Sequence, residues 1–164
     1  MDFRTNRDAR EEADIYYFKK LVYDISEGFE VIREDDEYAR QDCWIKNTES
    51  GILTPVELKG RDINLDTIKD EGVLIDLSKV KAVTDGGRGV ICQFFPLNNK
   101  ALVWVISKED VLGLNIVDKY CRKNNVEKER VLKRMVMLQV QNAKVFDLDM
   151  HAYYKIVAFA TSLV

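Results

Sequence analysis

The chain has 164 residues, of which 46% are hydrophobic and 32% are charged, which is the composition of an ordinary globular protein. No apolar run approaches the roughly 20 residues that a bilayer-spanning helix needs, and the charged N-terminus lacks the apolar segment of a secretory signal. We therefore expect no membrane contact and a cytoplasmic location, in the host cytoplasm if the protein is phage-encoded. The net charge of −3 and the pI of about 5.3 argue against a dedicated high-affinity nucleic-acid binder.

Charge is distributed unevenly along the chain. Residues 24–37 hold seven acids against one arginine, and residues 119–134 hold seven bases against two glutamates. This asymmetry permits a polyanion to approach one side of the protein, although solvated helix faces account for it equally well. The cysteines lie far apart and His151 has no partner at zinc-site spacing, so we expect neither zinc nor disulfides, and buried thiols at Cys43 and Cys92.

The N-terminal third is predicted to contain one helix and three strands. A helix is expected over 8–26, because Ile15, Phe18, Leu21, Val22 and Ile25 recur at spacings of three and four. Its acids Glu11 and Glu12 would then lie in the first turn, where they favour helix formation. A strand follows at 29–33, and two more lie within 41–61, joined by a polar turn.

The remaining elements are predicted from their apolar patterns and from the turn residues between them. In chain order they are a helix over 74–83, a β-hairpin formed by 89–95 and 101–106, a partly helical segment over 111–123, a strand over 135–140 and a helix over 150–163. No repeat, low-complexity tract or linker divides the sequence. We therefore expect one α/β domain that spans residues 1–164.

The strongest chemical signal lies in the two strands of residues 41–61. Glu57 and Lys59 are two residues apart on the second strand, so their side chains point to the same face. Pairing with the first strand brings Asp42 beside them. Two carboxylates and an ammonium at one sheet edge form a site for a divalent metal ion and a water. A same-face ion pair on an exposed strand, with Asp42 capping a turn, is the alternative interpretation.

An acid-bearing helix followed by Asp42 and then by Glu57-x-Lys59 on paired strands resembles the PD-(D/E)XK nuclease superfamily, particularly its small phage and bacterial members. The resemblance covers about residues 8–106. It implies an α/β fold with a mixed central sheet flanked by helices, built on a restriction endonuclease-like core (α-β-β-β-α-β). A C-terminal strand and helix would be added within about 107–164. Gln41 stands where members of the superfamily often carry proline, a position that varies widely among them.

The resemblance also implies a metal-ligand set. Asp42, Glu57 and the backbone carbonyl of Leu58 would bind Mg²⁺ or Mn²⁺, hard cations that take oxygen ligands and keep waters. Glu12, or its neighbour Glu11, would complete the shell directly or through water.

The implied reaction is hydrolysis of a DNA phosphodiester bond by in-line attack. Lys59 would orient or help deprotonate the attacking water and offset charge on the phosphorane, while the metal lowers the pKa of that water. Lys79 and Arg61 are candidates to contact the phosphate backbone, and surface salt bridges account for both residues equally well.

Two other functions are compatible with the sequence. The acidic pI and the unmatched final third suit a non-catalytic binding or assembly module on the same fold, such as a phage accessory or structural protein, which leaves a homo-oligomer open. An enzyme directed at RNA is the other, and substrate assays distinguish it from a deoxyribonuclease.

Overall fold

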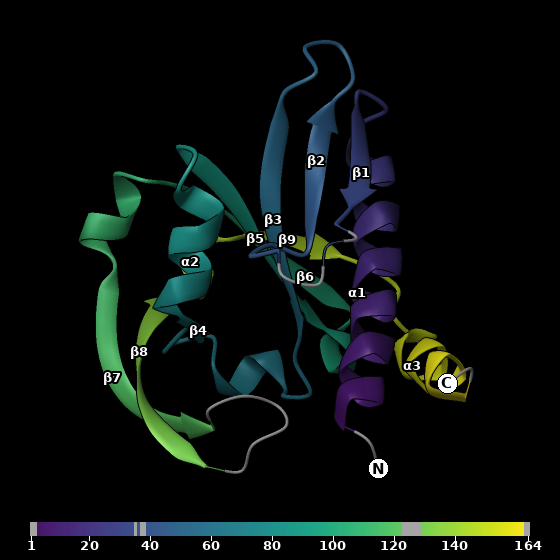
Figure 1. The fold of residues 1–164 in the computed structure, drawn as a ribbon. Coiled ribbons are helices and arrows are strands. Elements are labelled where there is room, and N and C mark those ends of the chain that lie inside the picture. The colour runs from purple at the N-terminus through teal and green to yellow at the C-terminus, as the bar shows by residue number, and fades with distance from the viewer. Residues whose placement is uncertain (1–2, 35, 37–38, 123–128, 163–164) are drawn as a thin grey trace.

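Two β-sheets organise the chain, one with six strands and one with three (Figure 1). The computed structural model describes residues 3–34, 36, 39–122 and 129–162. The helices are α1 (Phe3–Ile25), α2 (Leu77–Thr84) and α3 (Tyr153–Ser162). The strands are β1 (Phe29–Arg33), β2 (Cys43–Asn47), β3 (Leu53–Gly60), β4 (Val73–Asp76), β5 (Arg88–Phe95), β6 (Lys100–Ser107), β7 (Asn115–Arg122), β8 (Arg130–Leu138) and β9 (Lys144–Asp147).

The larger sheet is mixed, with strand order β1-β2-β3-β5-β6-β9. Strands β1, β2 and β3 pair antiparallel, whereas β3 and β5 pair parallel. A parallel pair needs a crossover connection, and the segment that contains β4 and α2 supplies it. The order α1-β1-β2-β3-α2-β5 confirms the predicted α-β-β-β-α-β core and the mixed central sheet flanked by helices. Strand β4 is an insertion in it.

Helices cover both faces of the large sheet (Figure 1). Leu58 and Cys92 pack in one core cluster with residues of α1 and α3. Ile91 and Phe95 pack in a second cluster with α2 and the smaller sheet, whose order is β4-β8-β7. Because neighbouring side chains on a strand point to opposite faces, Glu57 lies on the side of α2.

Several predicted elements are confirmed. The strand at 29–33 and the hairpin of 89–95 and 101–106 are present as β1, β5 and β6, and Cys43 and Cys92 are buried. The first helix begins at Phe3, because neither glycine nor proline interrupts the residues before the predicted start. Glu11 and Glu12 therefore lie in the middle of the helix.

The second half of the chain differs more from the prediction. Leu74 belongs to β4, so the helix predicted from there begins only at Leu77. The segment 111–123 was predicted partly helical, but β7 pairs with β8 from Asn115 onward, and its β-branched and aromatic residues suit a strand. The C-terminal part thus adds three strands and a helix. In α3, Phe159 is 65% exposed.

None of the helices within the described ranges is long and apolar enough to cross a membrane.

Replacing Gly89 with alanine tests how closely α2 packs on the sheet. A Cβ atom at Gly89 would lie 2.2 Å from the carbonyl oxygen of Val83, whereas one at Gly86 would meet no atom within 4 Å. We expect Gly89→Ala to lower the free energy of unfolding by about 1–3 kcal/mol, and Gly86→Ala to leave it within about 0.5 kcal/mol of wild type. Urea unfolding measures both, and equal effects would contradict the packing.

Candidate active site

Asp42 is held against the neighbouring strand by two hydrogen bonds. Its backbone N–H donates to the carbonyl of Val56 over 3.0 Å, which continues the pairing of β2 with β3 by one residue. Its carboxylate accepts a hydrogen bond from the N–H of Leu58 over 2.7 Å. The side chain therefore crosses onto β3 beside Glu57, and the two carboxyl groups interact directly. Burial raises the pKa of Asp42, against the hydrogen bond from Leu58.

The carboxylate of Glu57 is buried and half satisfied. Oε1 lies 3.0 Å from Nζ of Lys79 on α2, while Oε2 is buried without a hydrogen-bond partner. Burial raises the pKa of Glu57 to about 8, and the negative charge of Asp42 adds to the shift. The ammonium of Lys79 opposes this shift in the pKa of Glu57. Burial would lower the pKa of Lys79, but the negative charge of Glu57 raises it. Ionising both acids at once is therefore unfavourable in the protein as it stands.

Lys59 lies on the same face of β3 as Glu57, two residues further along. Burial lowers its pKa, followed by the positive charge of Arg61, while the charges of Asp14 and Glu57 oppose the shift. Of the sequence-predicted set, Asp42 and Glu57 are brought together, and Lys59 lies two residues along the same face of β3.

Arg61 is committed to the protein itself. Its Nε donates to the side chain of Gln93 over 3.1 Å, and its NH2 group donates to the carbonyl of Leu74 over 2.7 Å. These contacts connect the end of β3 to β5 and β4. We therefore do not propose Arg61 as a phosphate contact. Gln93 was not among the predicted residues, although a polar side chain within the apolar strand β5 is a signal that the sequence contains.

The helix acids occupy different places. Glu12 forms an ion pair with Arg33 of β1. The negative charge of Glu11 adds to the rise in the pKa of the Cys43 thiol, which burial mainly causes. Asp14, which the sequence interpretation passed over, is buried and lies within electrostatic range of Asp42 and Lys59. The position was detectable, because Asp14 precedes Phe18 by four residues and Leu21 by seven and thus lies on the apolar stripe.

Asp14 joins three elements beneath the site. Its carboxylate accepts a hydrogen bond from the hydroxyl of Tyr153 on α3 over 2.7 Å and one from the N–H of Gly60. Burial raises the pKa of Asp14 to about 7, against the hydrogen bond from Tyr153. A Cβ atom at Gly60 would lie 2.1 Å from the Tyr153 hydroxyl, so only glycine fits there.

A divalent cation suits this donor set. The two acids lie together, so that ionising both is unfavourable, and Glu57 Oε2 is left without a partner. Mg²⁺ is commonly held by one or two carboxylates together with waters. Among the residues that the structure describes, no three or more His, Cys, Asp or Glu side chains gather as a metal-ligand group. A metal here would therefore depend on Asp42 and Glu57.

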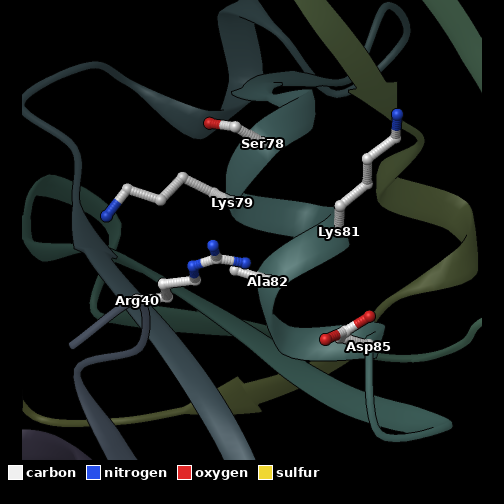
Figure 2. Close-up of a pocket in the computed structure, with 6 residues that line it drawn as sticks. All are labelled: Arg40, Ser78, Lys79, Lys81, Ala82 and Asp85. Atoms are coloured by element: carbon white, nitrogen blue, oxygen red, sulfur yellow. The ribbon is translucent and has the colours of Figure 1, made fainter.

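An open pocket of about 620 Å³ lies along α2, lined by Arg40, Ser78, Lys79, Lys81, Ala82 and Asp85 (Figure 2). Lys79 connects it to the acids, since its ammonium contacts Glu57. Figure 2 shows Arg40 and Lys79 on one side of α2 and Lys81 on the other. Two cationic side chains therefore lie on the side of α2 where Lys79 contacts Glu57.

Neither a family model nor a curated protein matches the sequence. Among solved structures, the chain is similar to the Holliday junction resolvase Hjc of Archaeoglobus fulgidus, an archaeal hyperthermophile. The likeness has a TM-score of 0.38 at 16% sequence identity, and it covers 74% of this chain and 93% of the resolvase chain. So distant a likeness does not bear on what this chain does.

Asp14→Asn is expected to change how stability depends on pH. Because the pKa of Asp14 is about 7 in the fold against an ordinary 3.8, the stability contributed by its proton is complete below the ordinary value and is lost as the pH rises through about 7. Asparagine keeps an acceptor for Tyr153 and does not titrate. The free energy of unfolding of the variant, relative to wild type, should therefore rise by on the order of 2–4 kcal/mol between about pH 4 and about pH 8.

Urea unfolding in EDTA at both ends of this interval makes the measurement. A difference between variant and wild type that stays constant with pH would contradict the assignment. The subtraction also removes the titration of Glu57, which both proteins share.

Proposed function

We propose that this protein is a divalent-metal-dependent nuclease of the PD-(D/E)XK type that hydrolyses phosphodiester bonds in DNA. The observation that carries the proposal is the adjacent pair of half-buried Asp42 and buried Glu57, with Glu57 Oε2 unpartnered and Lys59 on the same face of β3. The α-β-β-β-α-β core supports it, because this order of elements is the one that the sequence resemblance implies.

The chain's own residues would divide the work of hydrolysis. Asp42, Glu57 and the Leu58 carbonyl would hold Mg²⁺ or Mn²⁺, which when bound lowers the pKa of a coordinated water and polarises the phosphoryl oxygen. Lys59 would orient the attacking water and offset the negative charge that develops on the phosphate. The new P–O bond forms as the bond to the leaving sugar oxygen breaks.

Substrate would approach along α2. The pocket beside the acids presents Arg40 and Lys79, whose charges suit a phosphate backbone. In the free protein Lys79 contacts Glu57. Its side chain remains half exposed toward the pocket, where the phosphate backbone would be its second partner. Glu12 would act on the site only through another group, because it pairs with Arg33. Asp14 would support the site from beneath through Gly60.

Divalent metal binding tests the first part of the proposal without an activity assay. A cation bound to the folded state raises the melting temperature, by several degrees when its concentration is about 100 times the Kd. We expect Mn²⁺ and Mg²⁺ to stabilise wild type and the Glu49→Gln control, whose exposed acid lies in the β2–β3 turn. Glu57→Gln should lose most of the shift.

Failure of both ions to bind would contradict this part of the proposal. If neither ion shifts the melting temperature of wild type, and calorimetry detects no binding, the site is not a metal centre. A stable oligomer in light scattering would then favour the binding or assembly module.

Cleavage of plasmid and linear DNA with Mg²⁺ or Mn²⁺ tests the reaction itself. Glu57→Gln and Lys59→Ala should each reduce the rate by about 10²-fold or more, while Glu49→Gln retains it. Cleavage at the wild-type rate by either site variant would show that the observed nuclease is a contaminant or uses another site. Parallel assays on RNA of the same sequence decide between the two polymers.

A further inference from the structure

The outer half of the β7–β8 hairpin extends beyond the rest of its sheet. Strand β8 pairs with β4 only from Met135 to Leu138, whereas it pairs with β7 from Arg130 to Met137. Residues 118–121 and 130–134 therefore form a two-stranded ribbon, which we call the arm. Figure 1 shows the hairpin on the side of the molecule opposite α1 and α3. A two-stranded ribbon is only marginally stable by itself.

One face of the arm exposes an aromatic and an aliphatic side chain together. Tyr120 lies directly opposite Leu132 in the strand register, and they are 67% and 57% exposed. This is the face that, further along β8, packs into the core through Val136. The core-side face of the ribbon thus continues past the body of the protein with apolar side chains that remain in solvent.

Arginines flank the apolar pair. Arg130 and Arg134 lie two residues to either side of Leu132, on the same face of β8, and both are exposed. Arg134 approaches Asp118 at 3.9 Å, with both side chains more than half exposed, an ion pair that contributes little.

The opposite face places Lys119 across from Lys133, a like-charge pair that destabilises a ribbon. Asp76 lies 3.7 Å from Lys133 and offsets part of this charge. The described bases of the arm, Lys119, Arg130, Lys133 and Arg134, belong to the basic run noted in the sequence. Positive charge is therefore concentrated on the arm of a protein whose net charge is −3.

We infer that the arm binds a single strand of nucleic acid, with Tyr120 stacked on an unpaired base and Arg130 and Arg134 on the flanking phosphates. Aromatic side chains within a cationic track are the means by which proteins hold unpaired strands. A second copy of this chain is disfavoured, because a two-fold contact would bring the same positive patch against itself. The inference rests on the proposed function only in taking the nucleic acid to be DNA and not RNA.

Fluorescence anisotropy with a labelled oligothymidylate of about 20 nucleotides, longer than typical single-strand site sizes, tests the arm in EDTA, where no cleavage occurs. The double variant Arg130→Ala/Arg134→Ala should weaken binding about tenfold or more, and should reduce the slope of log K against log salt by about 1.4. Tyr120→Ala should weaken binding about fivefold or more at unchanged slope, and Tyr120→Phe should bind like wild type. The matched control is Lys20→Ala/Lys155→Ala, which removes two exposed bases on α1 and α3.

The outcomes separate this inference from the proposed function. Loss of binding in the arm variants with no nuclease activity in wild type would support the arm and remove the enzyme. Cleavage by wild type together with arm variants that bind like the control would overturn the arm and leave the enzyme. Equal or tighter binding of a matched duplex, or a dimer that Tyr120→Ala converts to monomer without changing oligonucleotide affinity, would also overturn it. Circular dichroism and melting temperatures verify that each variant is folded.

Discussion

The hydrogen bond from the Leu58 N–H to the Asp42 carboxylate is the constraint from which the site follows. At 2.7 Å it places the first acid on the backbone of the strand that carries the second, Glu57, and it does so from a position that continues the β2–β3 pairing. The half-buried Asp42 and the buried Glu57 are thereby held together, and burial raises the pKa of both acids. Ionising both groups at once is therefore unfavourable. A bound cation is the ligand that would relieve this cost.

The parallel pairing of β3 with β5 determines what surrounds the acids. Parallel neighbours require a crossover, and here the crossover ends in α2, which packs against the sheet closely enough that Gly89 lies under Val83. That contact brings Lys79 to Glu57 and creates the cationic pocket on the same helix. The topology thus supplies both the counter-charge of the site and the path to it.

Sequence reasoning succeeded where a single periodicity carried the information. The two-residue period of a strand was enough to place Glu57 and Lys59 on one face, and pairing of adjacent strands was enough to bring Asp42 to them. It failed for residues whose structural role depends on partners far away in the sequence. Asp14 is chemically significant because Tyr153, 139 positions away, donates to it, and no local pattern contains that contact. The segment 111–123 was predicted to be partly helical, whereas β7 pairs with β8 from Asn115 onward, and its β-branched and aromatic residues favour a strand.

The C-terminal third is integral to the site and not merely appended to a complete core. Through α3 it donates the Tyr153 hydroxyl to Asp14, directly beneath the backbone of Gly60, the residue that follows Lys59. Through β8 it completes the core cluster against which α2 packs, with Val136 and Leu138 buried beside Val80. The two contributions fall on opposite faces of the large sheet, one beneath the strand that carries Lys59 and one behind the helix that carries Lys79. Loosening the C-terminal third would therefore disturb both basic side chains nearest the acids, while the Asp42 to Leu58 hydrogen bond lies wholly within the N-terminal core.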